Sequence, residues 1–345
     1  MRAAVLRDGK LVVTEHPEPP VPKPDQVTVE VLANGICGTD LHMVADLDGW
    51  WDATKRAEDR MKLFDRDRDV VIGHEFAGRV IAVGDEVSTV AVGDLVYCQP
   101  LAIAPDGTLH CLGFSNDYPG GLGERATVDA AMVVRLPEGL SAEHATFLDP
   151  MGVGEYAVNR RARIPAGEPA LVVGTGPVGL GVIAALRRAG ASTIVAVEPT
   201  PLRREAAAKV GADVTVDPAE RAWTEVWAEL GFTGPAWVFD TSGAAGMVPR
   251  LVEEVPMRSV ITTVASGTRD EPMKPSIAVK KDLTLHFAMG GSTEIYARMA
   301  EELVAGRPDV TGLVTVIGLD DVADAFEALR TPNEHVKIAV RQNPS

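Results

Sequence analysis

The feature that most restricts how this chain can fold is a glycine-rich turn, G-T-G-P-V-G, at residues 174–179. The turn follows an apolar run, ALVV at 170–173, and opens a helical stretch that continues to Ala189. The next apolar run ends in an acid, Glu198. A strand, such a turn, a helix and an acid at the end of the second strand are the parts of a dinucleotide-binding βαβ unit. The sequence therefore predicts a doubly wound α/β sheet in this part of the chain.

Each glycine of the turn has its own task in such a unit. Gly174 permits the tight turn, Gly176 lets backbone N–H groups approach a pyrophosphate, and Gly179 lets the helix pack close to the sheet. We assign Pro177 and Val178, between the last two glycines, to the same cofactor site. The alternative is a structural turn in a sheet protein that binds no nucleotide. The agreement of strand, helix and acid favours the dinucleotide.

Glu198 bears on which dinucleotide is bound. A carboxylate at this position accepts hydrogen bonds from the adenosine ribose and repels a 2′-phosphate, which favours NAD over NADP. Arg203 and Arg204 follow closely, and guanidinium groups there could instead hold that phosphate. We expect NAD, with Arg203 beside the cofactor.

The pattern of apolar runs and turn residues changes near residue 150. Before it, short β-rich runs alternate with Gly, Pro and Asp turns, which is typical of an antiparallel, barrel-like domain. After it, apolar runs alternate with helical stretches, as in a parallel sheet covered by helices. The tail at 319–340 reads as a helix and then a strand, which we expect to return to the first domain. The strands expected after residue 150 are 170–173, 193–198, 213–217, 236–240, 259–265 and 282–288.

The helix that follows the glycine turn carries one apolar stripe at helical spacing, which predicts one buried face. The stripe consists of Val178, Val182, Ala185, Leu186 and Ala189.

Composition excludes several classes of function. The 345 residues carry a net charge of −16, which argues against a nucleic-acid or anionic-membrane partner. No run of about 18 apolar residues occurs, so no membrane span is expected. The N-terminus lacks the apolar core and cleavage site of a signal peptide. Cysteines occur at positions 37, 98 and 111, too few for a disulfide framework. We expect a cytoplasmic protein.

Cys37 lies in the segment GICGTDLHM at 35–43 and is open to four interpretations. A redox thiol is disfavoured because no C-x-x-C partner is present. A nucleophile is disfavoured because no general base is adjacent. A buried free thiol and a metal ligand remain.

Two other polar clusters support the metal interpretation, around His74 in VVIGHEFAGRV and around Asp149 in ATFLDPMGVGEYAVNR. Cys37, His74 and a later carboxylate would give one S, one N and one O ligand, and three protein ligands with an open position are typical of catalytic zinc. His74 may be read instead as a hydrogen-bonded core histidine. Asp149 precedes Pro150, a pattern that also favours a helix N-cap.

Taken in order, the motifs resemble those of the zinc-dependent medium-chain alcohol and polyol (sorbitol-like) dehydrogenases over nearly the whole chain. The matching segments are GICGTDLH, GHEFAGRV, GGLGERATV, DPMGVGEYAVNR and GTGPVG. The resemblance implies an α/β protein with a GroES-like β-barrel catalytic domain, split in sequence, around a Rossmann domain with a doubly wound parallel sheet. The implied boundaries are 1–152 and 291–345 for the catalytic domain and 153–290 for the NAD-binding domain.

The resemblance also implies a ligand set. Cys37 and His74 bind one catalytic Zn²⁺. Asp149 stands where sorbitol-type members have Glu and alcohol dehydrogenases have Cys, and Glu75 is a nearby acid that can approach the metal. Asp40 is the carboxylate that orients the zinc histidine.

The implied reaction takes a hydride from a secondary alcohol, a polyol or a sugar-like substrate and gives it to NAD, yielding a ketone or aldehyde. By resemblance, Thr39 passes the released proton to the cofactor ribose and His42 passes it to solvent. His42 is alternatively a histidine in a surface loop. Further cofactor contacts are expected from the strand ends at 239–243 and 263–267.

Two regions depart from the family pattern. The lobe that commonly holds a structural zinc with four cysteines keeps only Cys98 and Cys111, so we expect no structural zinc. The segment 45–71 looks longer and more charged than usual. Its residues Ala53, Ala57 and Met61 are spaced by four, which predicts a short amphipathic helix.

Trp50 and Trp51 in this segment either wall an apolar substrate cleft or anchor the helix, and we favour the cleft slightly. The tryptophans point to an apolar or cyclic alcohol, whereas the polyol-like ligand pattern points to a sugar.

A homodimer or homotetramer is expected, with pairing through LTLHFAMGG at 283–291. The alternatives to an alcohol dehydrogenase are a zinc-free quinone or enoyl reductase of the same superfamily and a non-catalytic nucleotide-binding protein.

Overall fold

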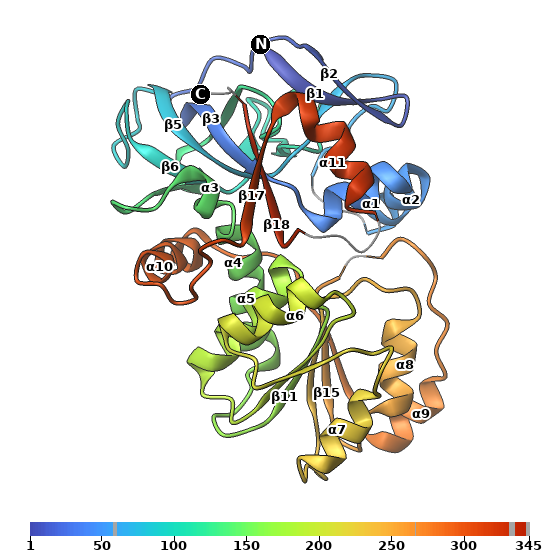
Figure 1. The fold of residues 1–345 in the computed structure, drawn as a ribbon. Helices are drawn as coiled ribbons and strands as arrows, with labels where there is room; N and C mark the ends of the chain where they lie inside the picture. Colours follow the sequence, from blue (N-terminus) through green and yellow to red (C-terminus); the bar gives the residue numbers. More distant parts are fainter. Residues whose placement is uncertain (58–60, 266, 331–334, 343–345) are drawn as a thin grey trace.

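The structure, a computed structural model, describes residues 1–57, 61–265, 267–330 and 335–342. An antiparallel β region and a parallel α/β region lie at opposite ends of the molecule, and the β region holds both the first strand, β1, and the last, β18 (Figure 1). The chain enters the α/β region through α4 (Leu148–Tyr156) and leaves it through α10 (Thr293–Val304). No helix within the described ranges is long and apolar enough to cross a membrane.

The α/β region is the doubly wound sheet that the glycine turn predicted. In the described part of the chain its six parallel strands run in the order β13-β12-β11-β14-β15-β16, the arrangement of a Rossmann fold. Every expected strand is present within its expected range. The strands are β11 (Ala170–Val173), β12 (Ile194–Val197), β13 (Val214–Val216), β14 (Trp237–Asp240), β15 (Val260–Thr263) and β16 (Thr284–Phe287). The accompanying helices are α5 (Pro177–Ala189), α6 (Pro201–Val210), α7 (Trp223–Glu229), α8 (Met247–Glu254) and α9 (Pro275–Lys281).

The β region is built mainly from antiparallel strands, which confirms the predicted fold class. Its larger sheet has the order β10-β6-β5-β3-β18-β17, with β9 also paired to β3; a second sheet has the order β2-β1-β4, and β7 and β8 form a hairpin. The strands are β1 (Arg2–Arg7), β2 (Lys10–Glu15), β3 (Gln26–Gly35), β4 (Val70–Val71), β5 (Glu75–Val83), β6 (Leu95–Cys98), β7 (Leu101–Ile103), β8 (Leu109–Cys111), β9 (Arg125–Asp129), β10 (Val133–Arg135), β17 (Val314–Gly318) and β18 (Lys337–Arg341).

Short helices border these sheets. The last strand, β18, lies in the larger sheet because it pairs with β3. The domain boundaries at 152/153 and 290/291 stay predictions. The helices are α1 (Gly38–Ala45), α2 (Leu47–Arg56), η1 (Ala130–Met132), α3 (Ala142–Ala145), η2 (Ala157–Ala162, a π-helical continuation of α4), η3 (Leu319–Asp321) and α11 (Val322–Ala328).

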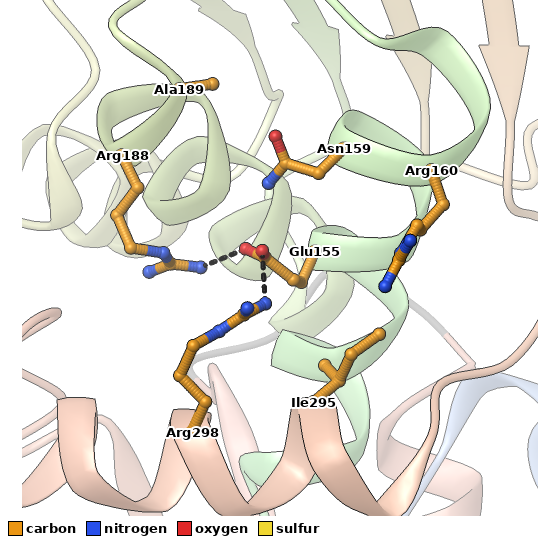
Figure 2. A pocket seen from close by; sticks show the side chains of 7 residues that line it. All are labelled: Glu155, Asn159, Arg160, Arg188, Ala189, Ile295 and Arg298. Carbon is orange, nitrogen blue, oxygen red and sulfur yellow. Dashed lines mark hydrogen bonds and ion pairs between the residues drawn. The ribbon is translucent and has the colours of Figure 1, made fainter.

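An ionic junction joins three helices where the two regions meet. The carboxylate of Glu155 in α4 accepts hydrogen bonds from Arg188 in α5, at 2.8 Å, and from Arg298 in α10, at 2.6 Å (Figure 2). One nearly buried carboxylate therefore connects the entering helix, the first Rossmann helix and the returning helix.

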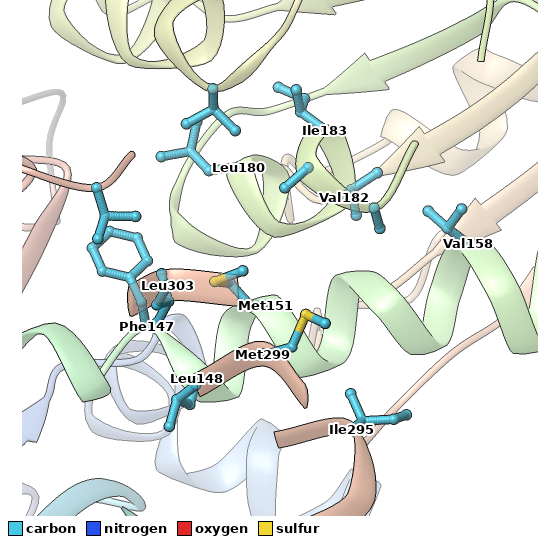
Figure 3. Close-up of a cluster of buried hydrophobic side chains, with 14 of the residues drawn as sticks. Phe147, Leu148, Met151, Val158, Leu180, Val182, Ile183, Ile295, Met299 and Leu303 are labelled. Atoms are coloured by element: carbon cyan, nitrogen blue, oxygen red, sulfur yellow. The ribbon is translucent and has the colours of Figure 1, made fainter. Parts of the chain in front are cut away.

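The same three helices share a hydrophobic cluster that includes Met151, Ile183 and Met299 (Figure 3). The stripe expected on α5 is buried at Val182, Ala185 and Leu186, but burial extends beyond it to every residue of 179–186. The reason is tertiary: the sheet covers one face of α5, and α4 covers the other. The two helices approach so closely that a Cβ added at Gly154 would overlap the backbone of Gly181.

The helix predicted from Ala53, Ala57 and Met61 is only partly correct. Helix α2 begins at Leu47, because the Asp46 side chain accepts a hydrogen bond from the Gly49 N–H and caps it, and it ends at Arg56. Met61 is not helical but forms a β-bridge with Leu109. Residues 58–60 of the predicted segment lie outside the described residues.

Candidate active site

The pairing of β3 with β5 brings Cys37 and His74 together. Gly35, the last residue of β3, is the register partner of Glu75, the first residue of β5. Cys37 follows β3 as the N-cap residue of α1, and His74 directly precedes β5. Two residues far apart in the sequence therefore lie at one end of the same strand pair.

Three donor atoms of different kinds meet at this point. The Cys37 sulfur, a His74 ring nitrogen and a Glu75 carboxylate oxygen all lie within 4.8 Å of one another. Sulfur, nitrogen and oxygen donors together suit Zn²⁺, and three protein ligands leave a position for substrate or water. Of the predicted ligands, the structure brings Cys37, His74 and Glu75 into this group and leaves Asp149 outside it.

Asp40 contacts both residues of the Cys–His pair. Its Oδ1 lies 2.9 Å from His74 Nδ1, and its Oδ2 accepts a hydrogen bond from the Cys37 N–H at 3.3 Å. Occupation of Nδ1 leaves Nε2 as the nitrogen with which His74 could bind a metal ion. Burial opposes the charged imidazolium, but the charges of Asp40 and Cys37 outweigh it and hold the pKa of His74 well above 6.5.

Glu75 has a buried cationic partner that sequence reasoning missed. Lys337, the first residue of β18, forms an ion pair with Glu75 Oε2, and both side chains are 1% exposed. Lys337 also donates to the Ile36 carbonyl at 3.3 Å. Burial raises the pKa of Glu75 although the Lys337 charge opposes the shift. The signal in the sequence was a lysine directly before the apolar run IAV of this strand, KIAVR.

Asp149 lies in the first turn of α4 and is held by Tyr296 of α10. The Tyr296 hydroxyl donates to Asp149 Oδ1 at 3.3 Å. Burial raises the pKa of Asp149, while the nearby charges of His74 and Lys337 oppose the shift. The N-cap alternative for Asp149 was wrong, because α4 begins one residue earlier and Phe147 is its N-cap. Tyr296 is 147 positions away in the sequence, and no local signal marks it.

The surroundings of the Cys–His pair fit a bound cation. Glu75 is buried and Cys37 and Asp149 are half-buried, and loss of solvent raises the pKa of all three groups. The Tyr97 hydroxyl, fully buried, has no hydrogen-bond partner in the part of the chain that the structure describes, and its ring lies 5.1 Å from that of Tyr296. A metal ion bound between these acidic groups would stabilise their ionised forms, so their chemistry fits a cation site.

The dinucleotide turn has the backbone geometry that its sequence requires. Gly174 adopts φ +85°, and a Cβ there would lie 2.8 Å from the Ser242 backbone, so only glycine fits. Gly176 is the N-cap of α5 and Pro177 its first residue. Nothing lies within 4 Å of a Cβ added at Gly176, so the approach to the helix N-terminus is open.

Glu198 is tied to this turn, and the two arginines after it have protein partners. The Glu198 carboxylate accepts hydrogen bonds from the N–H groups of Thr175, at 2.9 Å, and Thr200, at 3.0 Å. Arg204 forms an ion pair with Asp217, and the Arg203 Nε donates a hydrogen bond to the His335 carbonyl at 3.2 Å.

Helix α1 carries the predicted proton path, with Thr39 in its first turn and His42 one turn later. His42 is partly buried, which lowers its pKa. A Cβ added at Gly243 would lie 3.3 Å from His42 Nε2, so this histidine faces the end of the segment 239–243, just beyond β14. The second expected cofactor segment, 263–267, contains Ser266, which lies outside the described residues.

The predicted tryptophans belong to an aromatic stack. Trp50 stacks on Phe64, at 5.8 Å between ring centroids, and on Phe114, at 5.2 Å. Phe114 in turn lies 5.2 Å from the His74 ring and was missed by sequence reasoning. Trp51 packs edge-on against Phe64 and lies under the Arg66 guanidinium. Trp50 is therefore connected to His74 through one ring, that of Phe114, whereas Trp51 contacts the stack only through Phe64 and lies two rings further out.

Two family models match the chain: the alcohol dehydrogenase GroES-like domain over residues 23–138 and the zinc-binding dehydrogenase over residues 177–305. (R,R)-Butanediol dehydrogenase of Bacillus subtilis is 32% identical over 356 residues, which cover 99% of this chain and 100% of that protein. The crystal structure of 2R,3R-butanediol dehydrogenase from Bacillus subtilis matches with a TM-score of 0.80 and 31% identity over 99% of both chains.

Two further proteins match along their lengths. Sorbitol dehydrogenase of Bacillus subtilis is 27% identical and covers 99% of this chain and 98% of its own. A zinc-binding dehydrogenase from Sinorhizobium meliloti, bound to NADP, has the same fold, with a TM-score of 0.79 and 23% identity over 99% of both chains.

Proposed function

The chain belongs to the zinc-dependent medium-chain alcohol and polyol dehydrogenases, oxidoreductases that act on alcohols, and we propose that it oxidises a small secondary alcohol or vicinal diol with NAD. The observation that carries the proposal is the Cys37–His74–Glu75 cluster, in which Glu75 is buried and the other two side chains are half-buried. Helix α1 links this cluster to the dinucleotide turn. It begins after Cys37 and carries His42, which faces Gly243, while the neighbouring Ser242 contacts Gly174.

We propose that Cys37 and His74 hold one Zn²⁺ per chain, with Glu75 as the carboxylate that the geometry favours and Asp149 as the carboxylate next to it. No structural zinc is proposed for the lobe of Cys98 and Cys111. When bound, Zn²⁺ lowers the pKa of a substrate hydroxyl and the nicotinamide ring accepts a hydride.

The chain's own residues supply orientation and proton transfer. Asp40 engages Nδ1 of His74, so that Nε2 is presented to the metal. The Thr39 hydroxyl accepts the substrate proton and can donate its own onward. Burial lowers the pKa of His42, which keeps its ring neutral near pH 7 and able to accept that proton and release it to solvent.

NAD is the proposed cofactor because Glu198 places a carboxylate beside the turn. A 2′-phosphate would meet this negative charge. The two guanidinium groups that could have bound the phosphate are engaged elsewhere, Arg203 with His335 and Arg204 with Asp217.

The substrate proposal rests on the aromatic stack beside His74. Phe114 and Trp50 present apolar ring surface near the metal-binding histidine, which favours a short alkyl chain over a sugar with many hydroxyl groups. The relative named for butanediol agrees with this substrate class, and the relative named for sorbitol provides the competing substrate.

The test combines metal analysis with initial rates. We expect one zinc per chain by elemental analysis, a higher kcat/KM for 2,3-butanediol than for sorbitol, and faster turnover with NAD than with NADP. Cys37→Ser should lose zinc and activity while NADH binding, followed by fluorescence, is retained. Cys111→Ser is the matched control and should behave as wild type. Full activity after chelation of the metal would overturn the proposal.

We further propose a cytoplasmic homodimer or homotetramer that pairs through β16. This strand lies at the edge of the sheet, and Phe287 and the nearby Met289 are 64% and 83% exposed. Phe287→Asp should lower the mass measured by light scattering; a monomeric wild type would contradict the pairing.

A further inference from the structure

A cavity of about 450 Å³ lies where α5 and α10 meet the end of α4 and the start of η2. Its polar lining consists of Glu155, Asn159, Arg160, Arg188 and Arg298 (Figure 2). Asp149, in the predicted metal site, lies in the first turn of α4, whereas Glu155 lies in its last turn. The cavity is therefore separate from the active site and plays no part in the proposed reaction.

The charges around this cavity do not cancel. Arg188 and Arg298 share the single carboxylate of Glu155. Arg160 makes no side-chain hydrogen bond or ion pair with any described residue and borders the same cavity. Glu302 lies close enough for Arg188 and Arg298 to lower its pKa, but its carboxylate is already bound by Arg307 in two hydrogen bonds.

Three arginines, the exposed Arg160 among them, thus border the cavity with one carboxylate, which Arg188 and Arg298 already bind, in a chain whose net charge is −16. Such a local excess of positive charge inside a concave site attracts anions. A purely structural ion network between the helices would need Arg188, Arg298 and Glu155 only. It would explain neither the unpaired Arg160 nor the open volume beside it.

We propose that this cavity binds a compact dianion, inorganic phosphate or the phosphate group of a small monoester. Arg188 and Arg298 reach the two oxygens of one carboxylate, so their guanidinium groups lie too close together to suit an extended dicarboxylate. Guanidinium forks bind phosphate oxygens in pairs, and the Asn159 amide adds a donor. Ile295 and Ala189 supply apolar surface for the carbon part of an ester.

The experiment measures binding by titration calorimetry on the zinc-loaded enzyme with saturating NADH, so that the nucleotide site is filled. The probes are inorganic phosphate and glycerol 3-phosphate, with succinate as the extended dicarboxylate and chloride as the monoanion at equal ionic strength. Arg160→Gln and Arg298→Gln test the site. Arg221→Gln, an exposed arginine paired with Glu229 on another surface, is the control. Melting curves establish that each variant is folded.

We expect saturable binding of both phosphate probes at one site per chain and none for succinate or chloride. Each of Arg160→Gln and Arg298→Gln should weaken this binding at least about tenfold, the usual effect of losing a charge-assisted hydrogen bond. Arg160→Gln removes no side-chain hydrogen bond or ion pair with any described residue, and the melting curve of this variant separates loss of binding from unfolding. The proposal is overturned if wild type shows no saturable binding, if both site variants bind as wild type does, or if Arg221→Gln weakens binding equally. None of these results depends on alcohol oxidation, so the proposed function is judged separately.

Discussion

Replacing Asp40 by asparagine tests how Cys37 and His74, the two proposed zinc ligands, are held in place. The Asp40 carboxylate is fully buried and has two partners, His74 Nδ1 at 2.9 Å and the Cys37 N–H at 3.3 Å. Asparagine has nearly the same shape, but one of its two terminal groups is a donor rather than an acceptor. The substitution therefore changes hydrogen bonding with little change in packing.

Both orientations of the new amide are unfavourable. If its oxygen accepts from the Cys37 N–H, its NH₂ faces His74 Nδ1 and moves the ring proton to Nε2, the atom needed for the metal. If it is turned round, the NH₂ faces the Cys37 N–H, and a buried donor loses its acceptor at a cost of about 1–3 kcal/mol. We expect Asp40→Asn to weaken zinc binding roughly 10- to 100-fold.

The assay is a competition for zinc between the protein and a chromogenic chelator at pH 7.5, with melting curves to show that the variant is folded. Asp48→Asn is the matched control, since Asp48 is exposed and pairs with Arg66 on the surface. A zinc affinity of Asp40→Asn within threefold of wild type would refute the reasoning, because it would mean that the carboxylate does not orient the histidine.

Three further predictions follow from the geometry. Zinc affinity should rise between pH 6 and pH 8 by up to about 100-fold per pH unit. The pKa values of Cys37 and His74 are both raised, so zinc must displace a proton from each group when it binds. A zinc affinity that does not change with pH in the chelator competition would contradict this prediction. Glu198→Ser should lower the NAD-to-NADP ratio of kcat/KM at least about tenfold, since a carboxylate no longer opposes the 2′-phosphate; an unchanged ratio would show that other groups select the cofactor. Gly154→Ala should destabilise the fold by about 1–3 kcal/mol, because the new methyl group overlaps the α5 backbone, whereas Gly234→Ala, in open space, should leave the melting temperature near that of wild type.

The parts of the site that could be predicted from sequence are those with a local signal. Cys37 and His74 are chemically uncommon residues at the ends of apolar runs, and the structure brings them together as expected. The glycine turn could be predicted because its conformation requires a particular residue type. The positive φ and the close packing at Gly174 allow only glycine. Both signals lie within a few residues of the feature they predict.

The parts that were missed depend on residues far apart in the sequence. Lys337 reaches Glu75 only because β18 returns beside β3, and Tyr296 reaches Asp149 only because α10 packs on α4. Phe114 looks like any other aromatic residue until it is found beside the His74 ring. Lysine, tyrosine and phenylalanine are common residues with many roles, so their types alone do not mark them.

The sequence by itself determined the fold class of this protein. Strand periodicity, the glycine turn and the acid after the second strand are local requirements of a Rossmann unit, and each acts within about thirty residues. Only the tertiary structure decided which carboxylate lies beside Cys37 and His74, because the positions of Glu75 and Asp149 depend on strand register and helix packing. The same holds for α5, whose two buried faces result from the approach of α4. Contacts between distant segments are chosen by the whole fold, because only the assembled layers bring those segments within reach of one another.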